Sequence, residues 1–305
     1  MQNYLFEDFK SNTKMQLKET IKLMLLSTFA FACMNATVKY LDNIGAFQIV
    51  FFRSAGSLFF TFGYLLKNKI PLIGNNNKLL ILRGVVGLTS MALFFMSTKY
   101  LPIGTAVSLR YLAPIFAAIF AVIFLKEKIF PFQWVFFILA FLGVVILKGF
   151  DSDLNTFGLI LILIAAVSSG LVYIIISKIG KSEHPVVIVN YFMVISATVG
   201  AVLTINSWVT PIGMQWVFLG LLGVFGYFGQ LLMTKAFQNA QTNQVAPIKY
   251  IEVIFTMLFG VSLFGEVYSF WSLCGIGLII AALILNIIYK DKKTKKIEAL
   301  KDSKV

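Results

Sequence analysis

The stretch "SLRYLAPIF", residues 108–116, carries a charged side chain, Arg110, inside a run of apolar residues. A second stretch, "PIKYIEVIF", residues 247–255, repeats the pattern with Lys249 at the position of Arg110 and with the same Tyr and Ile-Phe. Two copies of one pattern in one chain indicate an internal duplication. The rest of the sequence must therefore account for a repeated unit and for a cation in apolar surroundings.

The composition identifies the solvent in which this chain folds. Hydrophobic residues make up 59% of the 305 residues, charged residues only 13%, and the mean hydropathy is +0.87. A water-soluble protein of this length would not have enough polar residues to cover its surface. The chain is therefore expected to be a membrane protein.

Ten apolar runs are long enough to cross the ~30 Å hydrocarbon core of a bilayer as helices. Strands of a transmembrane barrel would be shorter and would alternate polar and apolar residues. The runs lie near residues 21–40, 44–66, 79–98, 103–125, 131–148, 157–177, 186–205, 213–234, 243–264 and 270–289. We therefore predict an all-α membrane protein with ten transmembrane helices.

Basic residues concentrate at both chain ends and in alternate connections. After the second run, for example, come Lys67, Lys69, Lys78 and Arg83, whereas the neighbouring connections hold few cations. By the positive-inside rule, both termini are expected to be cytoplasmic and the protein to be a multi-pass protein of the cytoplasmic (inner) membrane. This topology accounts for the net charge of +13, and since no aromatic-interleaved basic surface accompanies it, no nucleic-acid partner is predicted.

Internal repetition divides the chain into two similar units. An offset of 139 residues aligns Tyr111 with Tyr250 and Glu127 with Glu266, and an offset of 136 aligns Gly84 and Gly87 with two later glycines. We expect a cytoplasmic segment at 1–19, a first five-helix repeat at 20–149, a second at 156–289 and a basic cytoplasmic tail at 290–305. Met15 is a second candidate for the first residue of the protein.

A repeat of five helices has a consequence for orientation. Because five is odd, the second copy enters the membrane in the opposite sense to the first, which makes the two units inverted repeats. Such a pair can alternate between outward-open and inward-open states around one central site, as secondary transporters do.

Three segments carry a resemblance to a known family. They are "RGVVGLTSMALFFMSTKYLPIGTAVSL" at 83–109, "YLAPIFAAIFAVIFLKEKI" at 111–129 and "YIEVIFTMLFGVSLFGEVY" at 250–268. Together with the ten-helix duplicated plan, they resemble the EamA branch of the drug/metabolite transporter superfamily. The resemblance implies transport of a small organic metabolite, by exchange or ion coupling, through a central cavity between the halves. A proline often follows the Tyr-Leu-Glu motif of the family, whereas Val253 follows Glu252 here, so we do not expect a break in the ninth helix.

The two repeated cations are the leading site candidates. Arg110 lies seven residues into its run, roughly 10 Å from the outer face, and Lys249 is at the equivalent depth from the inner face. Glu252, three residues after Lys249 on the same helix face, is predicted to pair with it. Arg110 is then expected to have no acidic partner and to bind an anionic group of the substrate, although snorkelling to the interface is the alternative. Arg53 is as well suited to a structural role near the headgroups as to substrate contact.

Further candidates are aromatic or polar. Tyr111 and Tyr250 could stack on a planar part of the cargo. Tyr227 and Gln230 share a helix face, which suits a cavity and a polar helix contact equally. Pro114 is expected to bend the fourth helix, since it removes the usual partner of the Arg110 carbonyl.

These residues define the expected chemistry. An amino acid would place its ammonium on Glu252 and its carboxylate on Arg110, an organic anion would leave Glu252 to Lys249, and a nucleoside-like cargo stays open. We expect a transporter and not an enzyme, with no cofactor. No metal site is expected either, since two cysteines and one histidine offer few ligands for a soft metal. The expected partners are a small-molecule substrate and the lipid bilayer, and a homodimer is left open. The alternative is a non-transporting bundle with a lipid-handling or receptor-like role.

Overall fold

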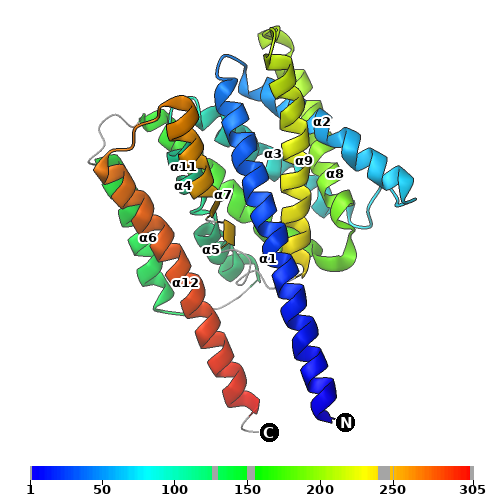
Figure 1. The fold of residues 1–305 in the computed structure, drawn as a ribbon, viewed down its shortest axis with the longest axis vertical. Coiled ribbons are helices and arrows are strands. Elements are labelled where there is room, and N and C mark those ends of the chain that lie inside the picture. Colours follow the sequence, from blue (N-terminus) through cyan, green and yellow to red (C-terminus); the bar gives the residue numbers. More distant parts are fainter. Residues whose placement is uncertain (1, 126–129, 150–154, 240–247, 250, 303–305) are drawn as a thin grey trace.

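The computed structural model describes residues 2–125, 130–149, 155–239, 248–249 and 251–302, and the regular elements in these residues are helices (Figure 1). The first half holds α1 (Gln2–Tyr40), α2 (Ala46–Lys67), α3 (Asn77–Ser97), α4 (Ile103–Arg110), α5 (Ala113–Leu125) and α6 (Gln133–Gly149). The second half holds α7 (Thr156–Ile179), α8 (Pro185–Thr204), α9 (Gln215–Asn239), α11 (Ile251–Phe264) and α12 (Phe270–Asp302). Two short 3-10 segments, η1 (Gly180–Ser182) and η2 (Ile205–Ser207), end α7 and α8.

The helices match the ten predicted membrane crossings. In the described residues, eight segments are long and apolar enough to span a bilayer, and two shorter apolar helices, Gln133–Ile146 and Ile251–Phe264, occupy the fifth and ninth positions. Helices form because hydrocarbon offers the backbone no hydrogen-bond partners, so each segment must satisfy its own N–H and C=O groups. The predicted all-helical membrane fold with two repeats is therefore confirmed.

Both chain ends lie at the same end of the bundle. α1 and α12 continue well beyond the apolar core, and both termini point to the same end of the bundle (Figure 1). An even number of crossings requires this arrangement.

Packing between helices reflects the duplication. The counterparts are α1 and α7, α2 and α8, α3 and α9, α5 and α11, and α6 and α12. Exchanging each helix for its counterpart turns the α1–α9 contact into α7–α3, the α5–α7 contact into α11–α1, and the α2–α9 contact into α8–α3. The pairs α2–α8 and α6–α12 each map onto themselves. All these contacts join one half to the other, so the two repeats form one interlocked bundle with its core between them.

One close approach explains a repeated glycine. A Cβ on Gly223 of α9 would lie 2.6 Å from the Cα of Gly56 in α2, which is closer than atoms can pack. Small residues at this position let the two backbones approach, as in other membrane bundles.

The fourth crossing is interrupted in the middle. α4 ends at Arg110, Tyr111 and Leu112 form a turn, and α5 begins at Ala113. Pro114 has no N–H to donate to the Arg110 carbonyl, so the helix cannot continue with regular hydrogen bonds. The interruption lies next to the proline at which the sequence predicted a bend.

The ninth crossing is described only in part. α11 begins at Ile251, and Ile248 and Lys249 before it have 3-10 conformation, whereas residues 243–247 and 250 of the predicted run lie outside the described residues. Lys249 therefore lies before α11, in which Glu252 is the second residue. Because α4 and α11 pack together, the end of α4 meets the beginning of α11 at the centre of the bundle.

Candidate functional site

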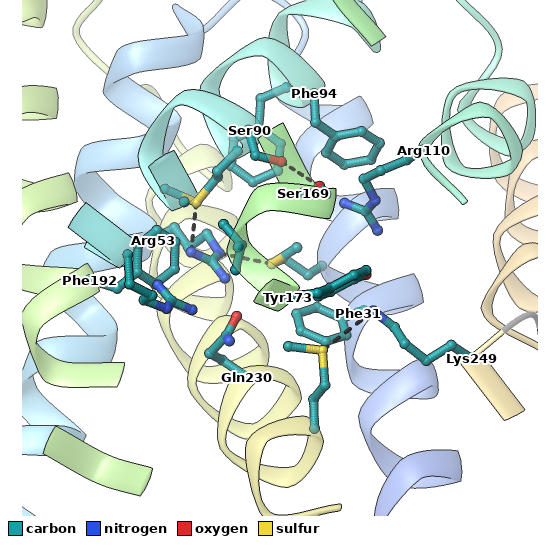
Figure 2. A pocket seen from close by; sticks show the side chains of 17 residues that line it. Phe31, Arg53, Ser90, Phe94, Arg110, Ser169, Tyr173, Phe192, Gln230 and Lys249 are labelled. Carbon is teal, nitrogen blue, oxygen red and sulfur yellow. Dashed lines mark hydrogen bonds between the residues drawn. The ribbon is translucent and has the colours of Figure 1, made fainter. Parts of the chain in front are cut away.

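A cavity of about 110 Å³ lies between the two halves (Figure 2). This is smaller than the ~300 to 1,000 Å³ of pockets for drug-sized ligands, which suits a small metabolite. Helices of both repeats supply its polar lining residues, which are Arg53, Arg83, Ser90, Arg110, Ser169, Tyr173, Gln230 and Lys249. Four of these eight residues are cations.

Arg53 of α2 and Arg83 of α3 form a buried pair of arginines on one wall of the cavity, each with only 3% of its surface exposed. Their guanidinium carbons lie 5.6 and 4.1 Å from the ring centroid of Phe192. A cation over an aromatic face is stabilised by about 0.5–2 kcal/mol, which is much less than a buried charge needs.

The hydrogen-bond partners of these arginines are weak or missing. Arg53 donates from Nε to the sulfur of Met34 at 3.1 Å and from Nη1 to the sulfur of Met91 at 2.7 Å. For Arg83, Nε and Nη1 are buried without a hydrogen-bond partner in the described part of the chain. No carboxylate in the described residues lies within ion-pair distance of Arg53 or Arg83. The pair therefore has donor capacity that a ligand can use.

Gly87 and Gly226 leave room for the arginine side chains. A Cβ on Gly87 would lie 3.1 Å from Nη1 of Arg83 and 3.2 Å from the Phe192 ring, and a Cβ on Gly226 would lie 3.0 Å from Cγ of Arg53. Gly87, identified in the sequence by its repeat, thus shapes the cavity wall.

The sequence predicted Arg110 to be an unpaired cation, and this prediction is wrong. Its Nη2 donates to Oε1 of Glu252 at 2.9 Å, across the boundary between the two halves. Glu252 is fully buried and also accepts hydrogen bonds from Tyr111 Oη at 2.7 Å and from Asn35 Nδ2 at 3.0 Å. The Arg110 guanidinium also lies 3.9 Å from the centroid of Phe94. The predicted Lys249–Glu252 pair is wrong because α11 begins after Lys249 and turns Glu252 toward α4.

Lys249 has aromatic and thioether neighbours instead of a carboxylate. Its Nζ donates to the sulfur of Met233 at 3.3 Å and lies 5.6 to 5.9 Å from the ring centroids of Phe31, Tyr111 and Tyr173. Within the described residues it forms no ion pair. Lys249 is thus a third cavity cation without an acidic partner.

The other predicted site residues are distributed differently. Gln230 lines the cavity, whereas Tyr227 stacks on Phe60 at 5.1 Å and is not a lining residue. Tyr111 and Glu252 also lie outside the lining and act through the hydrogen bonds that surround Arg110. Tyr250 lies outside the described residues.

Sequence reasoning missed Arg83. It counted this residue among the cations of a cytoplasmic connection, but Arg83 lies six residues into α3 and faces the cavity. The apolar residues on both sides of it were the available signal, because a buried cation in a membrane helix commonly marks a functional site. Tyr173 and Phe192 gave no comparable signal among so many aromatic residues.

A second polar cluster closes the end of the bundle opposite to the termini. Glu266, in the loop before α12, accepts from the backbone N–H of Ile103 at 2.9 Å and from Tyr268 Oη at 2.6 Å. Its Oε1 also lies 3.6 Å from Nζ of Lys39, which donates to the carbonyl of Thr98 at 3.2 Å. Burial and the hydrogen bond to Glu266 raise the pKa of Tyr268 above its ordinary value, so the phenol remains a donor. We call these contacts the Glu266 latch; they join the ends of α1 and α3 and the beginning of α4 to the loop before α12.

Comparisons with known proteins agree on one family. The family model described as "EamA-like transporter family" matches residues 19–148 and 156–288. The chain is 28% identical to the pseudopaline exporter CntI of Pseudomonas aeruginosa over 88% of this chain and 95% of that protein. It is 30% identical to the S-adenosylmethionine uptake transporter of Rickettsia bellii over 90% and 95%, and 28% identical to human solute carrier family 35 member G1 over 89% and 80%.

The fold also occurs among solved structures. One crystal structure superposes with a TM-score of 0.64 at 15% sequence identity and covers 88% of this chain and 94% of its own. At that identity the likeness concerns the fold alone.

Proposed function

This chain belongs to the EamA-like transporter family, and from that premise we propose that it is a secondary transporter that moves a small anionic or zwitterionic metabolite across the cytoplasmic membrane. Transport proceeds by alternating access, coupled either to exchange or to an ion. Both termini face the cytoplasm in this proposal, because the basic residues concentrate on that side.

The interlocked repeats support alternating access. Each half supplies part of the cavity wall, and exchange of the halves maps the helix contacts onto one another. Two related packings of similar energy are therefore available to the same bundle, one open to each side. The Glu266 latch closes the end opposite to the termini in the state described here.

The buried pair of Arg53 and Arg83 is the main support for an anionic or zwitterionic cargo. Burying a cation at the centre of a membrane helix costs ~2.5–3.5 kcal/mol even on the mildest scale. Two of them side by side, without a carboxylate among the described residues, are stabilised best by an anion that arrives with the cargo. An organic acid and an amino acid meet this requirement, whereas a neutral nucleoside does not.

The relatives support transport without defining cargo or direction. Their names describe an exporter of pseudopaline and an uptake transporter of S-adenosylmethionine, so related chains carry different solutes in opposite directions. The arginine pair of this chain is therefore the better guide to its own cargo.

Flux through proteoliposomes tests the proposal. Vesicles containing the purified protein are loaded with unlabelled amino acids and organic acids, and uptake of the same labelled solutes is measured. We expect saturable uptake of at least one anionic or zwitterionic solute, reduced at least about tenfold in Arg83→Gln. Lys178→Gln removes an exposed cation that does not line the cavity, so it should transport normally. The absence of saturable flux for every solute would favour a non-transporting bundle.

A further inference from the structure

The cavity cations are divided between two walls. Figure 2 shows Arg53 beside Phe192 on one side and Arg110 and Lys249 on the other, with Tyr173 and Phe31 between them. Arg83 belongs to the first wall, since it packs on the same Phe192 ring as Arg53. The two positive regions therefore lie at opposite sides of an aromatic middle.

Each wall keeps a net positive charge even when the Arg110–Glu252 ion pair is counted as neutral. Glu252 neutralises Arg110 on one wall, which leaves Lys249 there, and neither arginine of the other wall has a carboxylate in the described residues. A ligand with a single acidic group can compensate only one of these walls.

Methionine sulfurs occupy the positions where stronger acceptors would fit. Arg53 donates to Met34 and Met91, and Lys249 donates to Met233, with all three methionines lining the cavity. A thioether is a weak acceptor, whereas a carboxylate oxygen forms charge-assisted hydrogen bonds about twice as strong as neutral ones. Carboxylate oxygens can thus replace the sulfurs on both walls with a gain in binding energy.

We propose that the cavity binds a short organic dianion with one acidic group at each end, one held by Arg53 and Arg83 and the other by Lys249. This inference rests on the proposed transport function and specifies its substrate class. The paired arginines suit a planar carboxylate, because each guanidinium offers a fork of N–H donors. The single ammonium of Lys249 is a point charge that accepts an acid of less defined geometry. Phe31 and Tyr173 provide apolar contact for the carbon chain between the two acids.

Binding to the purified full-length protein tests the proposal without requiring transport. Calorimetry compares succinate, glutarate and adipate with butyrate and with glutaramate, the monoamide of glutarate. We expect one of the dicarboxylates to bind at least about tenfold more tightly than the singly charged probes, because its second acid gains a charge-assisted contact. The best chain length reports the separation of the two walls.

Substitutions assign each acid to its wall. In Lys249→Gln the dicarboxylate and its monoamide should bind equally, because the second acid no longer meets a cation. In Arg83→Gln the affinity for both should fall about tenfold, whereas Arg83→Lys should recover part of it. The exposed control Lys178→Gln should leave all affinities unchanged.

Three results would overturn the inference: equal binding of dicarboxylate and monoamide to the unsubstituted protein, an equal effect of Lys178→Gln and Lys249→Gln, or no binding of a dicarboxylate of any length. If saturable flux of a singly charged solute persists in such a case, transport stands and only the dianion is rejected. Binding with the expected pattern but without flux would support the site and reject transport.

Discussion

Arg110 Nη2 lies 2.9 Å from Glu252 Oε1, and this ion pair joins α4 of the first repeat to α11 of the second across 142 positions of sequence. The pair lies where α4 ends and α11 begins, at the centre of the interlocked bundle. Tyr111 and Asn35 complete the hydrogen bonds of the carboxylate. Arg110 therefore stabilises a buried acid, and the free cavity cations are Arg53, Arg83 and Lys249 within the part of the chain that is described.

The first prediction concerns stability. Arg110→Gln should destabilise the protein by about 3 kcal/mol, because removing one partner leaves the buried charge of Glu252 without compensation. Lys249→Gln should leave the unfolding temperature nearly unchanged, since Lys249 forms no ion pair with any carboxylate of the described residues. Thermal unfolding in detergent compares the two variants, and the double variant Arg110→Gln/Glu252→Gln should recover most of the loss. A greater loss in Lys249→Gln than in Arg110→Gln would contradict this assignment of partners.

The second prediction concerns the Glu266 latch. Glu266→Gln removes the ion pair with Lys39 and weakens the bond from the Ile103 N–H, so the end of the bundle opposite to the termini should open more often. An impermeant thiol reagent applied from outside should modify a cysteine at Ser90 about tenfold faster, given the ~1–3 kcal/mol of a lost charged hydrogen bond.

Labelling of the latch variant needs a background without Cys33 and Cys274, neither of which is disulfide-bonded. Glu183→Gln is the matched control, because Glu183 likewise accepts from a backbone N–H, that of Asn76 at 2.8 Å, but lies between α7 and α8. If both variants accelerate external labelling equally, the latch has no specific effect on that side.

The third prediction concerns orientation in the membrane. A cysteine placed at Asn206, in η2, should react with an impermeant reagent added outside intact cells, whereas cysteines at Asn76 and Ser182 should react only after the membrane is opened. This pattern follows from cytoplasmic termini and alternate crossings. The reverse pattern would reject the cytoplasmic placement of the termini while leaving the fold unchanged.

The fourth prediction concerns pH. His184 caps α8, since the N–H of Val186 donates to its Nδ1 at 3.3 Å. Partial burial, and to a smaller extent the charge of Lys235, lower the pKa of His184 below its ordinary value of 6.5. The fold therefore favours the neutral ring, and its stabilising effect is present above pH 6.5 and is lost as the pH falls through the lowered pKa. Protonation also removes the acceptor that caps the helix.

Unfolding temperatures measured between pH 7.5 and 5 should show this loss, which we expect to be below about 1 kcal/mol because the side chain is largely exposed. His184→Asn keeps a capping oxygen and does not titrate, so its decline over the same range should be smaller. Identical pH profiles for the two proteins would exclude a contribution from this cap.

The membrane fold could be read from the sequence because one physical constraint decides it. Hydrocarbon cannot satisfy backbone polar groups, so each apolar run of suitable length must become a helix. The repeated Tyr and Ile-Phe of residues 111–116 and 250–255 then reveal the duplication, and an odd number of helices in each copy implies inversion. The break at Pro114 follows from its missing N–H.

The partners of the buried charges were decided only by the tertiary structure. Glu252 is three residues from Lys249 in sequence but bonds to Arg110, because α11 begins after Lys249 and α4 ends beside it. The sequence analysis counted Arg83 among the cations of a connection, whereas the structure places it in α3, beside Phe192. Hydropathy determines which segments enter the membrane. The rotation of each helix and the position of its ends, which depend on packing between the halves, determine which side chains meet there.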